Sequence, residues 1–396
     1  LFALPCPFCL QYCFCSLVTM RTPPMLMFVG TLLIATYNSL VNSLSIAVFG
    51  GSGFLGRRVC KELVSSGHEV TSVSREGRPP SYYTGSNDAE NCWADKVNWL
   101  SYNVNPDNDQ VLELPTIDAG ISCIGNVNPD PDWDKLSFFG LSFDDEKLYY
   151  ENGILNECAA LLAKKNGAKR FVFMSVSYEI AKMVEGPLDG YTGGKRHAEH
   201  VICDFFGSEN SIVLGPSLIY GGRRFPVLGR FYSKFARSGA VKFYANSMDA
   251  LRNLSSSPIE DWVEKSLLSP PVEVNVVARV ACASALGMVT KDMVGARRQG
   301  FCNDEGKPVF YDDVVYIDGT AELERVDGLV HLDLPKEDQL KHDRYNIPVS
   351  TLHTEGSEPL WEGGLIGKTP YLYPLPIISI FAALFYIIST GQFVNH

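Results

Sequence analysis

The sequence has little positive charge, and this shortage excludes several classes of function. Its 396 residues carry a net charge of −11, whereas a general nucleic-acid binder needs a basic face for the phosphates. We therefore expect no nucleic-acid partner. Arg21 is the one basic residue before Arg57, although a mitochondrial presequence is typically Arg-rich and amphipathic. The polar excess of a disordered chain is also lacking, since 46% of the residues are hydrophobic.

Cysteines in a pairing pattern are lacking as well. The chain has 11 cysteines, of which several lie in the first apolar stretch and the rest are scattered through predicted core elements. This distribution favours reduced, buried thiols over a disulfide framework. Neither a second Cys-x-x-Cys pair nor a histidine follows Cys6-x-x-Cys9 closely, and the acidic insertion 126–145 lacks the ligand spacing of a calcium site. We therefore predict no metal site.

Apolar segments at the two ends of the chain predict targeting or membrane attachment. In residues 1–43, Arg21 precedes an apolar run and small polar residues, as in a hydrophobic targeting leader or signal anchor. Residues 371–391 are almost wholly apolar, with the length of a C-terminal transmembrane helix. Residues 313–370 are acidic and without sustained periodicity, which predicts a linker or tail. The globular domain is therefore expected over residues 44–312.

A glycine-rich turn stands between a predicted strand and a predicted helix. The apolar run 45–49 leads into Gly50-Gly51-Ser52-Gly53-Phe54-Leu55-Gly56, and a helical pattern follows over 57–66. Glycines let the backbone approach a pyrophosphate, and the helix N-terminus stabilises its negative charge. We predict that these seven residues bind a dinucleotide.

The second predicted strand, 69–74, ends without the carboxylate that binds the hydroxyls of an adenosine ribose. Ser74 and Arg75 stand there instead. A hydroxyl and a guanidinium suit a 2′-phosphate, which predicts NADP(H), with NAD(H) as the alternative. In the simpler interpretation, Arg75 is only a solvated loop residue.

Strands and helices alternate through the rest of the globular region. Strands are predicted over 97–104, 118–124, 170–175 and 211–214, and helices over 146–165, 190–206 and 277–290. This alternation predicts an α/β fold with a doubly wound parallel Rossmann sheet and a smaller C-terminal substrate lobe from about residue 216. Gly125 follows the fourth strand, where a small residue lets the cofactor cross the sheet edge.

Tyr191 and Lys195 lie four residues apart on a predicted helix and therefore share one face. A nearby ammonium stabilises a phenolate, so the tyrosine can exchange a proton with a carbonyl or an alcohol. Lys195 can also hold the nicotinamide ribose. A hydroxyl from Ser175 or Ser177, at the end of the preceding strand, would orient the substrate oxygen.

These motifs resemble those of the extended and atypical short-chain dehydrogenase/reductases (SDRs). The resemblance covers about residues 44–294 and includes the glycine loop, Asn152, Tyr191-Thr192-Gly193-Gly194-Lys195 and Pro216–Gly221. Val48–Gly56 with Val73–Pro79 is similar to an atypical subgroup that contains the NAD(P)H-binding accessory subunit of respiratory complex I, a ubiquinone-biosynthesis protein and plastid relatives. Asn103, Asn152 and Pro216 complete the predicted cofactor site. Gly215 departs from the arginine that often precedes the proline.

We therefore predict a membrane-tethered NADP(H)-dependent oxidoreductase that acts on a small hydrophobic carbonyl or quinone-like substrate. The alternative is a non-catalytic NAD(P)H-binding accessory subunit of a membrane protein complex. A secretory glycoprotein is a third interpretation, based on the sequon at Asn253. The family resemblance implies the mitochondrial inner membrane, whereas the signal-like leader favours a plastid or ER membrane. The C-terminal helix would contact the lipid bilayer.

Overall fold

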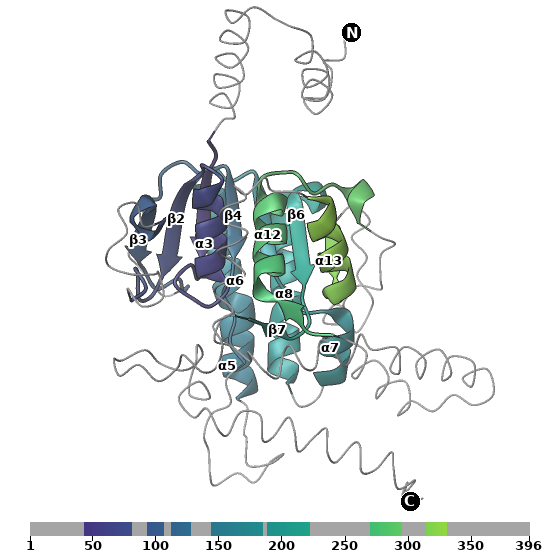
Figure 1. Ribbon diagram of the computed structural model, residues 1–396. Coiled ribbons are helices and arrows are strands. Elements are labelled where there is room, and N and C mark those ends of the chain that lie inside the picture. The colour runs from purple at the N-terminus through teal and green to yellow at the C-terminus, as the bar shows by residue number, and fades with distance from the viewer. Residues whose placement is uncertain are drawn as a thin grey trace, which may run out of the picture. The chain divides into compact units, whose positions relative to one another are not determined.

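The computed structural model describes residues 43–80, 93–106, 112–127, 144–184, 188–221, 270–294 and 314–330. The chain divides into two units, residues 1–43 and 44–396, and the fold below is that of the second (Figure 1). The predicted leader up to residue 42, the anchor 371–391 and Asn253 lie outside the described residues. Within the described part, no helix has both the length and the apolar character needed to cross a membrane.

Seven parallel strands form the central sheet, in the order β3-β2-β1-β4-β5-β6-β9. The order reverses between β1 and β4, which is the doubly wound arrangement predicted from the sequence. The strands are β1 (Ser45–Phe49), β2 (Glu69–Ser74), β3 (Val97–Ser101), β4 (Ala119–Ser122), β5 (Arg170–Met174), β6 (Ser211–Gly215) and β9 (Val315–Asp318).

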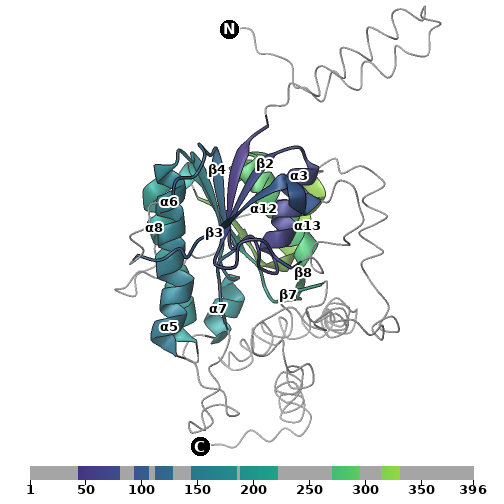
Figure 2. The same ribbon diagram turned by 90° about the vertical axis from the view of Figure 1, so that its left-hand side faces the viewer.

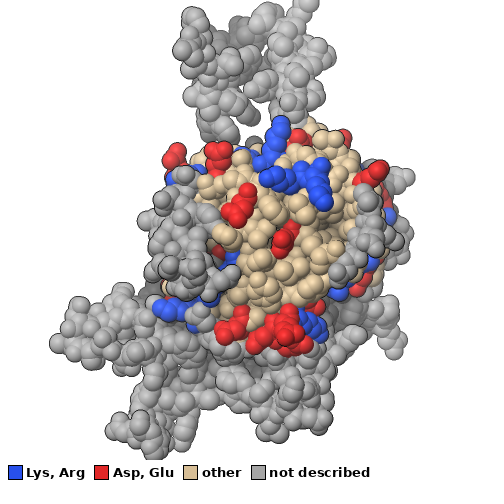
Figure 3. Space-filling model, turned by 180° about the vertical axis from the view of Figure 1, so that it is seen from behind, with Lys and Arg blue, Asp and Glu red and all other residues tan. Residues whose placement is uncertain are grey.

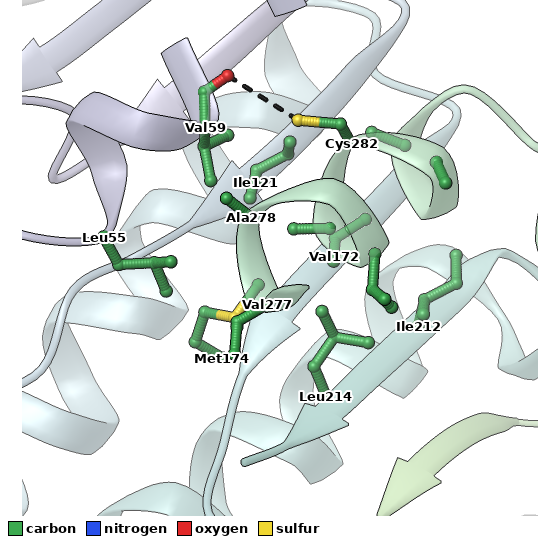
Figure 4. Packing of buried hydrophobic residues seen from close by; sticks show 14 of the residues in the cluster. Leu55, Val59, Ile121, Val172, Met174, Ile212, Leu214, Val277, Ala278 and Cys282 are labelled. Atoms are coloured by element: carbon green, nitrogen blue, oxygen red, sulfur yellow. Dashed lines mark hydrogen bonds between the residues drawn. The ribbon is translucent and has the colours of Figure 1, made fainter. Parts of the chain in front are cut away.

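One face of the sheet is covered by α3 (Gly56–Ser65), α12 (Val274–Ala285) and α13 (Gly319–Leu329), which contact one another in that order. Figure 4 shows the apolar core between α3, α12 and the strands, where Val59 of α3 packs near α12. The Cys282 thiol donates a hydrogen bond to the carbonyl of Val59 at 3.6 Å. Each fully buried aliphatic side chain stabilises the fold by about 1.5–3 kcal/mol.

The opposite face is covered by one long helix and by α8 (Asp189–Phe206), as Figure 2 shows. The long helix consists of α5 (Asp145–Tyr149), the π-helical turn η2 (Tyr150–Ile154) and α6 (Leu155–Lys165). Phe171 of β5 packs between the sheet and α8. Its ring centroid lies 6.3 Å from that of Phe49 in β1 and 5.3 Å from that of Phe206 in α8.

Charged side chains near the ends of this helical layer complement the helix dipoles. Seen from behind in Figure 3, a group of acidic side chains lies at the bottom of the described surface and a group of basic ones near the top, with further charged side chains of both signs elsewhere on this face. The acidic residues Asp145 and Glu146 lie in the first turn of α5, and Lys164 and Lys165 lie in the last turn of α6. Both placements complement the helix dipole, which is positive at the N-terminus and negative at the C-terminus.

Shorter elements complete the described residues. They are α7 (Tyr178–Val184), the parallel pair β7 (Ile219–Tyr220) and β8 (Val272–Glu273), and the 3₁₀ turns η1 (Trp93–Lys96), η3 (Ser208–Asn210) and η4 (Lys291–Met293). The cysteines that the structure describes are free thiols, and Cys60, Cys203 and Cys282 among them are buried.

The sequence prediction was wrong for the beginning of the region 313–370. Residues 315–329 form β9 and α13, which belong to the sheet and its covering layer rather than to a linker. β9 has only four residues, which is too short to show a clear alternation. In α13 the buried Leu323 and Val326 stand among acidic residues, so the apolar stripe is narrow. Residues 331–370 lie outside the described part.

Two further boundaries differ from the predictions. The helix expected over 277–290 is α12, which begins at Val274 and ends at Ala285. The strand expected over 97–104 ends at Ser101. The described residues after 216 include α12, β9 and α13, which belong to the central sheet and its covering helices. The region predicted to be a substrate lobe from about residue 216 therefore contains elements of the main Rossmann fold.

Candidate functional site

The glycine loop connects the carboxyl end of β1 to α3. Gly50 has a φ of +77°, which only glycine adopts without strain. Its N–H donates a hydrogen bond to the Val73 carbonyl at 2.8 Å, which fixes the loop to the neighbouring strand β2. A Cβ at Gly56 would lie 2.2 Å from the carbonyl oxygen of Gly50, so the first turn of α3 packs directly on the loop.

These features fit a dinucleotide pyrophosphate. The loop lies where the strand order reverses between β1 and β4, and doubly wound sheets bind ligands at that point. The first turn of α3 contains no acidic residue and receives no side-chain cap from Leu55, its N-cap residue. The positive end of the helix dipole is therefore available to a bound anion.

The residues predicted to meet the adenosine end lie after β2 and β3. The Ser74 hydroxyl donates to the carbonyl of Gly77 at 3.1 Å, and therefore stabilises the turn. Arg75 is exposed and forms no ion pair with a described residue. Arg78, by contrast, pairs with Asp95 at 2.5 Å. The exposed Asn103 follows β3.

Lys195 projects from α8 toward the carboxyl ends of the central strands. It is 3% exposed, and its Nζ donates to the carbonyl oxygens of Met174 at 2.8 Å and Ile124 at 3.3 Å. The ammonium lies 4.9 Å from the ring centroid of Phe173 and 6.0 Å from that of Tyr191. The helix thus brings together the tyrosine and lysine that the sequence singled out, and Tyr191 is half-buried.

Burial dominates the electrostatics of Lys195. Desolvation lowers the pKa of its ammonium to about 8, against opposing effects of Glu199 and Cys123. Gly125 leaves room for this ammonium, because a Cβ at that position would lie 3.2 Å from Lys195 Nζ and 3.3 Å from Asn152 Oδ1. The predicted small residue after the fourth strand therefore borders the lysine.

Asn152 is fully buried in the π-helical turn η2. Its amide nitrogen donates to the carbonyl oxygens of Asn126 at 2.8 Å and Leu148 at 2.9 Å, and its Oδ1 accepts from the Asn126 N–H at 3.2 Å. Asn156, one turn later, accepts from the Ser122 hydroxyl at 2.5 Å. The two asparagines therefore hold the segment after β4 beside Lys195. Isolated π-helical turns frequently occur at functional sites.

Three glycines allow the helix of Asn152 to approach α8 closely. A Cβ at Gly194 would lie 2.8 Å from the carbonyl oxygen of Tyr149, and one at Gly153 would lie 3.0 Å from Gly194 Cα. A Cβ at Gly190 would lie 2.0 Å from the carbonyl oxygen of Asp145. The glycine-rich sequence around Tyr191 therefore determines the distance between the two helices.

The two predicted serines have partners within the fold. Ser175 is buried, and its hydroxyl donates to the carboxylate of Glu199. Ser177 accepts from the Ile180 N–H at 3.4 Å at the beginning of α7, and its own N–H donates to the Pro216 carbonyl at 3.0 Å. The structure thus places Pro216 beside the serine segment.

Comparison with known proteins identifies the family. Residues 46–242 match the family model described as the NAD dependent epimerase/dehydratase family. An uncharacterized chloroplastic protein of Arabidopsis thaliana is 32% identical over 240 residues, which are 60% of this chain and 70% of that protein. MIOREX complex component 2 of Saccharomyces cerevisiae is 44% identical over 278 residues, 63% of this chain and 98% of that protein. The chain belongs to the NAD dependent epimerase/dehydratase family.

Solved structures of low sequence identity also match. The Bordetella bronchiseptica enzyme WbmG in complex with NAD is 15% identical, with a TM-score of 0.34, over 49% of this chain and 60% of that chain. A UDP-galactose 4-epimerase is 13% identical, with a TM-score of 0.38, over 69% and 76% of the two chains. Membership of the NAD dependent epimerase/dehydratase family implies an NAD(P)-binding, SDR-like protein, as the sequence motifs predicted.

Sequence reasoning missed two residues near the proposed tyrosine and lysine pair. Glu199 is 3% exposed and accepts hydrogen bonds from Ser175 and from the phenol of Tyr316. Its spacing of four residues from Lys195 was a usable signal. Tyr316 comes from β9, in a region that the sequence predicted to be a linker, and no local pattern marked it. Among the described residues, no cluster of three or more His, Cys, Asp or Glu side chains is arranged to hold a metal ion.

Proposed function

We propose that this protein is an oxidoreductase of the SDR type in which Tyr191 exchanges a proton with a carbonyl or alcohol. The observation that carries this proposal is the buried ammonium of Lys195, 6.0 Å from the ring centroid of Tyr191 at the carboxyl edge of the sheet. A buried cation beside a phenol favours its phenolate form, which is the form that accepts a proton. A bound nicotinamide would supply or accept the hydride.

The cofactor residues follow from the loop and the strand ends. The backbone of Gly50–Gly56 and the N-terminus of α3 would hold the pyrophosphate. Lys195 would bind the nicotinamide ribose. Its ammonium lies next to Gly125 at the carboxyl edge of the sheet, and Gly125 has no side chain to fill the space beside it. We propose NADP(H) as the preferred cofactor, since Arg75 is exposed at the end of β2 and no ion pair with a described residue neutralises it.

We further propose a hydrophobic carbonyl or quinone-like substrate and an organelle membrane as the location. Support comes from the apolar segment 371–391, which lies outside the described residues, and from the chloroplastic relative. A plastid membrane, the mitochondrial inner membrane and the ER membrane are the alternatives. A membrane tether would keep the site close to substrates that partition into lipid.

The test is NADPH oxidation by the purified full-length protein against a panel of hydrophobic aldehydes, ketones and quinones. Tyr191→Phe should abolish turnover and leave NADPH binding within a few-fold of wild type. Tyr149→Phe is the matched control, because the Tyr149 ring contacts that of His197 rather than Lys195, with ring centroids 5.6 Å apart and the planes tilted by 45°. Unchanged turnover in Tyr191→Phe would refute the proton-transfer role.

A non-catalytic NAD(P)H-binding accessory subunit is the second candidate. The hydrogen bonds of the two serines favour this candidate, because a catalytic serine would have to bind the substrate oxygen. Instead, the Ser175 hydroxyl donates to Glu199, and Ser177 accepts a backbone hydrogen bond at the start of α7. One relative is itself named as a component of a complex. Extraction in mild detergent followed by native sizing tests this function, because a species of monomer size would count against it.

A further inference from the structure

Glu199 lies on the same face of α8 as the proposed proton-transfer pair, one turn after Lys195 and two turns after Tyr191. A buried carboxyl group is costly unless hydrogen bonds satisfy it. Glu199 receives two, from the Ser175 hydroxyl and the Tyr316 phenol. Ser175 directly follows β5 and Tyr316 belongs to β9. One carboxyl group therefore links α8 to two strands of the sheet.

This network also adjoins the backbone that holds Lys195. Met174, whose carbonyl accepts from Lys195 Nζ at 2.8 Å, is the residue before Ser175. The other contacts of the ammonium are the Ile124 carbonyl and two aromatic rings, which carry no formal charge. The carboxyl group of Glu199 is therefore the acidic group on α8 that is placed to balance the charge of Lys195.

We propose that Glu199 is a positioning residue whose negative charge raises the fraction of Lys195 that stays protonated at alkaline pH, where a buried ammonium otherwise loses its proton. The proposal rests on the proposed role of Lys195 in holding the cofactor and supporting Tyr191. Glu199 would act through its charge, in addition to fixing Ser175 and Tyr316.

Burial shifts the pKa values of Glu199 and Lys195 toward each other, and the charge of each group affects the other. Burial raises the pKa of Glu199 to about 8; Ser175, Tyr316 and Lys195 oppose this rise and Asp318 adds to it. Burial lowers the pKa of Lys195 to about 8, and Glu199 opposes it most. Two groups that titrate in the same range behave as a coupled pair. Once Glu199 is ionised, its negative charge favours the charged form of Lys195.

The remaining neighbours do not replace Glu199 in this role. Cys123, at the end of β4, also favours the charged form of Lys195, but burial raises the pKa of its thiol to about 12. It therefore stays neutral over the range in which Lys195 titrates. Asp318 faces Glu199 from β9 and disfavours its ionisation.

The experiment measures NADPH affinity of the full-length protein between pH 6 and 10, by the fluorescence of the bound nucleotide. We expect Glu199→Gln to bind NADPH within about twofold of wild type at pH 6.5. At pH 9 its affinity should be lower by about tenfold, the factor that one pKa unit carries. Glu199→Asp, which retains the charge, should restore much of the alkaline affinity.

Two outcomes would overturn the proposal, and a separate variant tests the proposed function on which it rests. If Glu199→Gln weakens binding equally at every pH, the residue has only a structural role and the proposal is wrong. If Glu199→Gln does not fold, Tyr316→Phe replaces it, because losing this hydrogen bond disfavours the Glu199 anion and should weaken alkaline binding to a smaller extent. A wild-type profile in Tyr316→Phe would then overturn the proposal. Lys195→Met tests the underlying function separately, since unchanged affinity and pH profile there would refute the cofactor role of Lys195 itself.

Discussion

Two adjacent glycines in α8 provide a direct test of how the site is built. A Cβ at Gly194 would lie 2.8 Å from the carbonyl oxygen of Tyr149 and 3.0 Å from the N–H nitrogen of Gly153, and both neighbours are backbone atoms. A Cβ at Gly193 would lie 3.5 Å from the edge of the Tyr149 ring, which is ordinary van der Waals contact. The two positions therefore share a helix and differ in the space that the methyl group would enter.

The expected difference in stability follows from two contributions. Alanine in a helix interior is more favourable than glycine by about 1 kcal/mol, so Gly193→Ala should stabilise the protein by up to that amount. Gly194→Ala gains the same contribution but forces two packed helices apart, at a cost of about 1–3 kcal/mol or more for overpacking. We expect Gly194→Ala to be less stable than Gly193→Ala by about 1–3 kcal/mol.

Urea unfolding followed by circular dichroism measures this difference, with the two variants compared at equal m-values. NADPH binding is the second readout. Displacing Gly153 also moves the adjacent Asn152, which holds the segment after β4 through hydrogen bonds of 2.8 and 3.2 Å to Asn126. Binding should weaken in Gly194→Ala and remain unchanged in Gly193→Ala. Equal stability of the two variants would refute the packing argument.

Three further predictions concern other parts of the fold. Arg75→Gln should reduce the preference for NADPH over NADH at least several-fold in paired binding titrations, and an unchanged ratio would exclude a 2′-phosphate contact. Burial lowers the pKa of His68, whose Nδ1 accepts from the Leu44 N–H at 3.3 Å. The stability that neutral His68 contributes should be lost as pH falls below about 6.5, because the unfolded state then binds the proton more readily. In unfolding measured at several pH values, His68→Gln should remove this pH dependence. Arg279 forms an ion pair with Asp327 at 2.6 Å. Arg279→Met alone should destabilise the protein by about 1–3 kcal/mol in thermal melts, because it leaves Asp327 without its partner. The double variant with Asp327→Leu should be destabilised less.

The sequence was informative wherever the candidate site is built from residues that are close in sequence. The turn Gly50–Gly56 was recognisable because strand, loop and helix follow one another directly, and the structure places them at the β1/β4 switch point. Tyr191 and Lys195 were recognisable because four residues make about one helical turn. In each case the geometry depends on local spacing, which a single sequence displays.

Contacts between distant segments could not be predicted in the same way. Tyr316 reaches Glu199 across 117 residues of sequence, and β9 is too short to show a pattern of its own. The partners of Ser175 and Ser177 likewise depend on how β5, α7 and α8 are packed. Side-chain spacing carries no information about such long-range pairings, because they result from the order of strands in the sheet.

The position of β9 has a consequence for biosynthesis. A chain that emerges from the ribosome with its N-terminus first completes the glycine loop long before residues 315–318 become available to pair with β6. Until then β6 has an unpaired edge, which is a template for association with other chains. Nascent or truncated chains that end before residue 314 should therefore bind chaperones or aggregate, even though every residue of the nucleotide loop is already present.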